Sequence, residues 1–226
     1  MLVGHLAVAL GAKRAEPRLS LGTLTLSAQL PDLIAFPLLI AGVERFEAVP
    51  GATINRSIGN IPYSHSLLAD AVWGAIFAGV YFLWRRHARG AWILFGAVLS
   101  HWVLDVISHR PDMLLAPGGH TLFGLQLWNS MPATLLVEGG LWLAAIIVYV
   151  RSTKASGQAG TLAFWAGVAL MTLAWYGNIT SGMDTNPVRA GVSGLVFFSL
   201  IVAWAGWMDH ARALNEASRR RAPRQA

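Results

Sequence analysis

Long apolar stretches are the feature that most restricts what this chain can fold into. A membrane-spanning helix needs about 20 consecutive, mostly apolar residues. Only 12% of the residues are charged, against about 25% in a typical soluble domain, so a water-facing surface could not cover such stretches. We therefore predict an all-α, polytopic bundle of transmembrane helices with the lipid bilayer as its surroundings. Its five clear spans are Ser64–Trp84, Gly90–Ser108, Met131–Val150, Thr161–Gly177 and Val188–Met208.

The first forty residues are less regular. Leu2–Ala12 is apolar but too short to span, and two prolines, Pro31 and Pro37, interrupt the apolar stretch Leu19–Ile40. Broken helices are tolerated inside membranes where they line a protein cavity. We expect a short, partly inserted helix followed by a broken or kinked one.

Basic residues cluster in alternate linkers between the predicted spans. Ten of the 17 lysines and arginines lie in the linkers after the first and third spans and in the C-terminal tail, whereas the opposite linkers hold four. Because cytoplasmic loops are enriched in lysine and arginine, this asymmetry places the C-terminus in the cytoplasm. Beside membrane spans, anionic lipid explains a basic tail better than nucleic acid does, so we expect no nucleic-acid partner.

The composition changes along the chain and divides it into three parts. Residues 1–130 form the predicted metal-binding part, residues 131–212 the scaffold spans, and residues 213–226 a basic cytoplasmic tail. The linker Arg151–Gly160 (RSTKASGQAG) is predicted to be flexible from its small and polar residues.

The strongest chemical signal is the segment Ser100–Arg110 (SHWVLDVISHR). His101, Asp105 and His109 recur every four residues, so they share one face near the end of a predicted span. A charged group in such a segment costs at least ~2.5 kcal/mol unless it finds a partner. A divalent cation would satisfy all three residues, because imidazole and carboxylate both ligate zinc, manganese and iron. A local hydrogen bond between histidine and aspartate is the alternative.

Three further residues extend this predicted site, and each has a simpler alternative role. His65 begins the first long span, on the membrane face that the charge pattern also assigns to His109; an isolated histidine there would face water. Asp32 follows a proline within an apolar stretch and could cap a helix instead. His5 alone would more often be a packed, hydrogen-bonded residue. Since the chain has no cysteine, the predicted metal ligands are His5, Asp32, His65, His101, Asp105 and His109.

Two more acidic residues lie within the spans. We consider Asp70, Glu138 and the ligand Asp105 as candidate proton acceptors in catalysis. Asp70 and Glu138 could instead orient a histidine ligand.

The remaining polar residues lie in linkers. Asp112 and His120 occupy a loop that could cover the site. His87 and His210 fall in linkers assigned to the cytoplasm, so we exclude them from the site.

Four short motifs occur in a characteristic order: Gly4–His5, Pro31–Asp32, Ser64–His65–Ser66 and Ser100–His101–x–x–x–Asp105. In order and spacing, residues 1 to about 125 resemble the YdjM-like family of inner-membrane-associated proteins described as metal-dependent hydrolases and as LexA-binding. Ile34 stands where many members have a second acid, and Asn60 where many have a further histidine. His109 and Asp112 are candidates to replace these two ligands.

The resemblance implies a metal site built from these residues, in a protein of the bacterial cytoplasmic (inner) membrane. It also implies a hydrolase acting on a phospholipid or lipid-linked phosphoester through metal-activated water. Zinc is the expected ion, with manganese and iron as alternatives, because bound zinc lowers the pKa of its water to about 7. A non-catalytic metal-binding protein and an ion or proton transporter are the other functions considered. LexA binding is disfavoured because only short linkers and the tail would face the cytoplasm.

Overall fold

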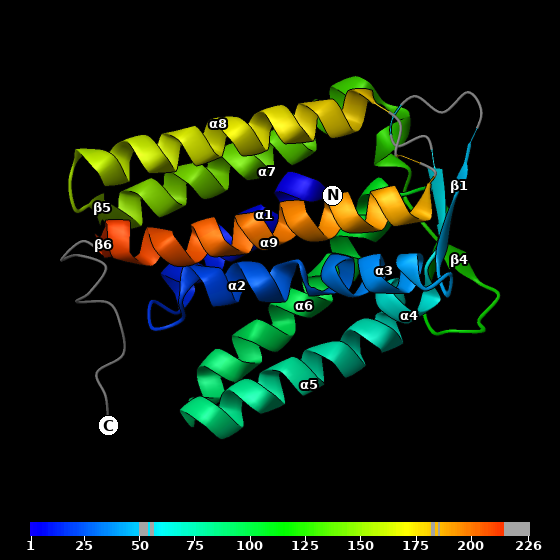
Figure 1. Cartoon of the computed structure of the whole chain (residues 1–226), viewed down its shortest axis with the longest axis horizontal. Helices are drawn as coiled ribbons and strands as arrows, with labels where there is room; N and C mark the ends of the chain where they lie inside the picture. The colour runs from blue at the N-terminus through cyan, green and yellow to red at the C-terminus, as the bar shows by residue number, and fades with distance from the viewer. Residues whose placement is uncertain (50–53, 55–56, 182–183, 185, 215–226) are drawn as a thin grey trace.

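Five long helices form the frame of the structure, a computed structural model that describes residues 1–226 except 50–53, 55–56, 182–183, 185 and 215–226. Each is long and apolar enough to cross a membrane, so the predicted all-α bundle with five spans is confirmed. Figure 1 shows these helices, and their bounds lie close to the predicted ones. They are α5 (Leu67–Arg85), α6 (Ala88–Ser108), α7 (Met131–Ser152), α8 (Gln158–Thr180) and α9 (Pro187–Ala211).

The start of the first long helix differs from the prediction. Ser66 is the N-cap of α5, and its side-chain oxygen accepts a hydrogen bond from the backbone N–H of Ala69 at 3.3 Å. The backbone of Ser66 is extended, so the preceding turn is a separate short helix, α4 (Pro62–His65). An N-cap of this kind satisfies an N–H group that has no partner within the helix. His65 therefore belongs to a turn that can be oriented independently of the long helix.

The N-terminal region consists of a short helix and a broken one, as predicted. Helix α1 (Leu2–Ala15) packs against α2, α6 and α7. Its neighbours α2 (Leu21–Ala28) and α3 (Leu30–Ile40) are bent by 54° relative to each other. Pro31 lies directly after this break, where its missing N–H interrupts the helical hydrogen bonds. Neighbouring helices thus pack around α1, which explains how a segment too short to span can lie inside the bundle.

Helix α9 joins the two ends of the sequence into one bundle. It packs against α2, α3 and α8, and Figure 1 shows it running beside α2 and α3. A Cβ atom added to Gly22 of α2 would lie 2.9 Å from the Cα atom of Gly206 in α9. Glycine at both positions lets the two backbones approach this closely. The predicted metal-binding part and the scaffold spans therefore share their packing.

Short antiparallel ladders close both ends of the bundle, and a 3-10 turn, η1 (Leu127–Asn129), precedes α7. At one end, β1 pairs with β2 and β3 with β4, and at the other β5 pairs with β6 (Figure 1). The strands are β1 (Arg45–Ala48), β2 (Ser57–Asn60), β3 (Met113–Leu114), β4 (Leu122–Phe123), β5 (Thr153–Ala155) and β6 (Arg212–Leu214).

The pairing of β5 with β6 corrects one prediction. Part of the linker that was predicted to be flexible forms β5, and the Nε atom of Arg212 donates a hydrogen bond to Thr153 Oγ1 at 3.1 Å. Composition does not reveal a pairing partner that arrives from the far end of the chain. Of the predicted tail, residues 215–226 lie outside the described residues.

Candidate metal centre

The centre begins with three residues at the end of α6. His101 and Asp105 are buried on one face of the helix, with His101 Nε2 3.3 Å from Asp105 Oδ2. His109 follows as the C-cap of α6, and its Nε2 atom lies 3.8 Å from Asp105 Oδ1. The four-residue spacing therefore produces the shared face that the sequence predicts.

Three other helices bring further donors to this face. From α1, His5 Nε2 lies 3.1 Å from Asp105 Oδ1, and the His5 ring stacks on His101 with centroids 3.6 Å apart. From α4, His65 Nε2 lies 3.3 Å from His101 Nε2. From α3, Asp32 Oδ1 lies 3.4 Å from His65 Nε2. All six residues predicted as ligands thus converge, although they come from four helices and a helix end.

In two of the histidines, the ring nitrogen that points away from the centre, Nδ1, is held by a hydrogen-bond acceptor. His101 Nδ1 lies 2.8 Å from the carbonyl oxygen of Ala28, which can only accept, so this nitrogen carries the hydrogen. His109 Nδ1 lies 3.1 Å from Asp112 Oδ1. In each ring the hydrogen bond leaves the Nε2 lone pair directed at the centre, as in metal-ligating histidines.

A relay of two residues holds His65 in the same way. Ser64 donates its hydroxyl hydrogen to Glu44 Oε2 at 2.7 Å, so its oxygen is available to accept from His65 Nδ1, also at 2.7 Å. Glu44 is itself buried and accepts further hydrogen bonds from the backbone N–H groups of Tyr63 and Ser64, both at 2.9 Å. The short helix α4 and its histidine are therefore fixed by one carboxylate.

The spacing and type of these donors fit a divalent cation. Two nitrogen ligands of a tetrahedral zinc ion lie about 3.3 Å apart, given bonds of about 2.0–2.1 Å. The Nε2 atoms of His65 and His101 have this separation, and both are acceptors in the neutral rings. Two facing lone pairs repel each other unless a proton or a metal ion lies between them. With Asp32 and Asp105 beside them, the donor set suits zinc, manganese or iron.

A positively charged group, the N-terminal ammonium, also contacts the centre. The N-terminal ammonium of Met1 donates a hydrogen bond to Asp105 Oδ1 at 2.6 Å and lies 3.1 Å from His5 Nε2. This contact shows that a cation is stabilised on the Oδ1 side of the carboxylate.

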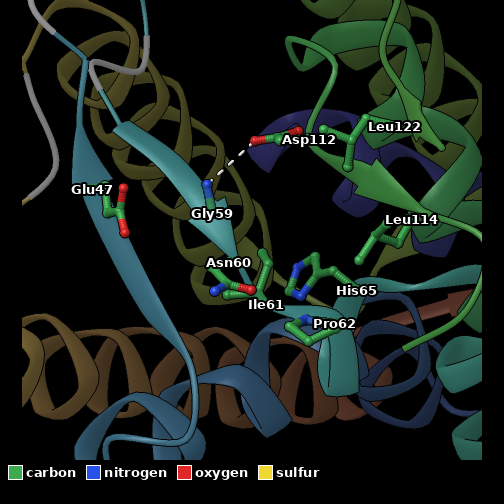
Figure 2. A pocket seen from close by; sticks show the side chains of 9 residues that line it. All are labelled: Glu47, Gly59, Asn60, Ile61, Pro62, His65, Asp112, Leu114 and Leu122. Carbon is green, nitrogen blue, oxygen red and sulfur yellow. Dashed lines mark hydrogen bonds between the residues drawn. The ribbon is translucent and has the colours of Figure 1, made fainter. Parts of the chain in front are cut away.

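Two cavities meet at His65. The larger, of about 540 Å³, is lined by Asp32, His65, Asp105 and His109 and by apolar residues of α3 and α9. The smaller, of about 280 Å³, lies between the two ladders at this end of the bundle. Figure 2 shows His65 beside Ile61 and Pro62 among the residues that line the smaller cavity, and Asp112 accepts a hydrogen bond from the backbone N–H of Gly59 at 3.3 Å. The centre is therefore open to an apolar space and to a more polar one.

A family model described as YdjM inner membrane protein matches residues 1–183. This match covers more than half of the 226 residues and includes every predicted ligand. The chain belongs to the YdjM inner membrane protein family. The match extends beyond the region of about 125 residues that the four motifs cover, so α7 and α8 are part of the family region as well. No curated protein and no solved structure matches this YdjM-family chain.

The two other candidate proton acceptors of this YdjM-family protein have different surroundings. Asp70 is fully buried in the first turn of α5, and neither of its carboxylate oxygens has a hydrogen-bond partner among the residues described. It interacts electrostatically with His101 and His65. Both oxygens of Glu138 accept indole N–H groups, from Trp128 at 2.6 Å and Trp175 at 2.8 Å. Asp70 thus retains acceptor capacity, whereas Glu138 links α7 to η1 and α8.

The other three histidines lie outside the centre. His87 is in the α5–α6 turn, about 20 Å along α6 from His101, and its Nε2 atom lies 3.6 Å from Glu16 Oε2. His120 is exposed in the β3–β4 connection, and His210 is exposed in the last turn of α9.

Sequence reasoning missed the roles of Glu44 and Ser64 in this YdjM-family site. Ser64 was interpreted only as part of a helix start and a family motif. Glu44 follows an apolar stretch directly, and an acid at that point is the signal that could have identified it. Neither residue type in isolation indicates an orienting role, because the relay exists only when the segment that follows α3 packs against α4.

Proposed function

We propose that this YdjM-family protein is a membrane-bound, metal-dependent hydrolase of a phospholipid or lipid-linked phosphoester. The observation that carries the proposal is the pair of Nε2 lone pairs on His65 and His101, which face each other at 3.3 Å. Each ring is held by a hydrogen bond at its other nitrogen, so neither ring can turn away without breaking that bond. A buried arrangement of this kind is explained by a cation at the centre.

In the proposed hydrolysis, some residues would bind the metal ion and another would accept a proton. A divalent ion would lower the pKa of water and polarise a phosphoryl oxygen. Asp32, His65, His101 and Asp105 would hold that ion at the edge of the larger cavity. Hydrolysis joins a water oxygen to phosphorus, breaks the ester P–O bond and transfers the proton of water to the released alcohol. Asp70 is our candidate to accept that proton first, because its two oxygens are not engaged in hydrogen bonds with the residues described.

The larger cavity supports a lipid as the substrate. Its lining combines the polar residues Asp32, His65 and Asp105 with aromatic residues such as Phe36 of α3 and Phe197 of α9. A substrate with a phosphoester group and an apolar chain matches this combination, because ligand cavities combine apolar walls with a few polar groups that fix orientation. In a membrane protein, such a chain would be supplied by the bilayer.

The charge pattern further supports a site on the non-cytoplasmic side. The linkers rich in lysine and arginine follow α5 and α7, at the end of the bundle opposite the centre. We propose that this opposite end, with the C-terminus, faces the cytoplasm.

Detergent-purified protein tests the function when it is incubated with phospholipids and with zinc, manganese or iron. We expect metal-dependent release of a phosphorylated product, measured by mass spectrometry. His101→Ala should lose metal and activity together, whereas Asp70→Asn should keep its metal and lose activity by about 10²–10⁴-fold. His120→Ala, at an exposed histidine, is the control and should keep both.

The two alternative functions, metal binding without catalysis and ion or proton transport, predict different results. A metal-loaded protein that is inactive on phospholipids with all three ions would contradict the hydrolase and leave metal binding without catalysis. Ion flux in proteoliposomes that disappears in Asp105→Asn would favour the transporter.

A further inference from the structure

The two carboxylate oxygens of Asp105 face different histidines. Oδ2 lies 3.3 Å from His101 Nε2 and 3.9 Å from His65 Nε2. Oδ1 lies 3.1 Å from His5 Nε2 and 3.8 Å from His109 Nε2. Asp105 thus stands between two pairs of imidazoles, one on each oxygen.

The number of donors exceeds what one ion takes. Four imidazole nitrogens and two carboxylates converge, whereas a tetrahedral zinc ion takes four ligands. His101 has a single nitrogen to offer, because its Nδ1 atom is bound to the Ala28 carbonyl oxygen at 2.8 Å. His101 can therefore bind only one ion, although it lies within reach both of His5 and Asp105 and of Asp32 and His65. We assign it to the Oδ2 side, because its Nε2 atom lies 3.3 Å from Oδ2 and Asp32 and His65 complete a set there.

His109 is oriented by a hydrogen bond at Nδ1, like the two histidines on the Oδ2 side. Its Nδ1 atom is held by Asp112 at 3.1 Å, and its ring packs against Trp128 with centroids 4.6 Å apart. Carboxylates that hold the outer nitrogen of a histidine are typical of metal-ligating histidines. A single ion bound by Asp32, His65 and His101 would not use His109 as a ligand, so it does not explain why His109 is oriented in this way.

We propose that the centre holds two divalent ions bridged by Asp105. The first lies between Asp32, His65, His101 and Oδ2, and the second between His5, His109 and Oδ1. This inference rests on the proposed function, since it assumes that the centre binds metal. Paired ions are suited to phosphoester hydrolysis, in which both the attacking and the leaving oxygen carry negative charge.

The Met1 ammonium lies where we place the second ion and would compete with it for Asp105 Oδ1. It already places positive charge beside Oδ1, at 2.6 Å, and close to His5 Nε2, at 3.1 Å. If the amine satisfies the carboxylate, a second ion is not needed, and the metal content will be one equivalent. The stoichiometry therefore separates the two explanations.

Elemental analysis of the full-length protein tests the proposal without any assay of activity. Detergent-purified protein is equilibrated with zinc and freed of excess metal. We expect two equivalents per chain in the wild type and in His120→Ala, and one equivalent in His109→Ala and in His5→Ala. Thermal melting of each variant without metal shows whether it is folded.

Manganese provides a second readout that does not depend on counting. Two Mn²⁺ ions bridged by a carboxylate give an exchange-coupled electron paramagnetic resonance spectrum, which we expect in the wild type. His109→Ala should show the six-line spectrum of an isolated ion. One zinc equivalent in the wild type would overturn the second ion and leave the proposed function intact. No bound metal in the folded wild type would overturn both, and a coupled spectrum with two equivalents in both His5→Ala and His109→Ala would refute the assignment of these ligands.

Discussion

Replacing Ser64 with alanine tests how the chain holds His65 in position. The hydroxyl group makes two hydrogen bonds of 2.7 Å, to His65 Nδ1 and to Glu44 Oε2. Both partners are buried, with 5% of His65 and 1% of Glu44 exposed. In Ser64→Ala, the His65 N–H loses its acceptor and the ring is free to turn.

The expected magnitude follows from these two bonds. Leaving a buried polar group unsatisfied costs about 1–3 kcal/mol, so the metal-free protein should melt at a lower temperature. Loss of a group that orients a metal ligand typically weakens metal binding by about 10–100-fold. At about 1.4 kcal/mol for each factor of ten, both effects have the size of one or two hydrogen bonds.

Zinc affinity, measured against a competing chelator, provides the assay. Ser152→Ala is the matched control, because Ser152 is a buried serine whose hydroxyl donates to the Val148 carbonyl oxygen, at 2.7 Å, far along the chain from the centre. The control should bind zinc like the wild type. If Ser64→Ala melts earlier but binds zinc with unchanged affinity, the relay serves stability alone and our account of His65 is refuted.

Three further predictions concern other parts of the molecule. Glu138→Ala should lower the melting temperature by leaving two buried indole N–H groups unpaired, at about 1–3 kcal/mol each, while the metal content stays unchanged; a loss of metal would contradict this. Because the chain has no cysteine, a membrane-impermeant thiol reagent applied to intact cells should label His120→Cys and spare Ser156→Cys, and the reverse pattern would invert our topology. Burial raises the pKa of the Glu16 carboxyl, but hydrogen bonds from Arg18 outweigh this and hold the pKa below its usual value. The ionised Glu16 carboxyl therefore stabilises the fold at neutral pH, and this contribution is lost as the pH falls through the lowered pKa. The melting temperatures of wild type and Glu16→Gln should differ at pH 7 and converge as the pH falls through that lowered pKa; a constant difference would exclude this linkage.

Local patterns determined much of this protein. The length of the apolar stretches was sufficient to predict five spans, because a helix that crosses lipid must satisfy its backbone internally. The spacing of His101, Asp105 and His109 was sufficient to predict a shared face, because it depends only on the helical repeat. Proline before Asp32 likewise indicated a broken helix, and the family motifs pointed to His5 and His65.

Tertiary packing decided the rest. His5 and Asp105 are 100 positions apart, and their 3.1 Å contact exists only because α1 lies inside the bundle beside α6. The Glu44–Ser64 relay and the β5–β6 pairing likewise join segments that no periodicity relates. The same packing pairs Glu138 with two indoles and leaves Asp70 without a hydrogen bond among the described residues, although both are acids in apolar helices. Sequence patterns report which face of a helix is polar, whereas the partner of that face depends on how helices distant in the chain pack in three dimensions.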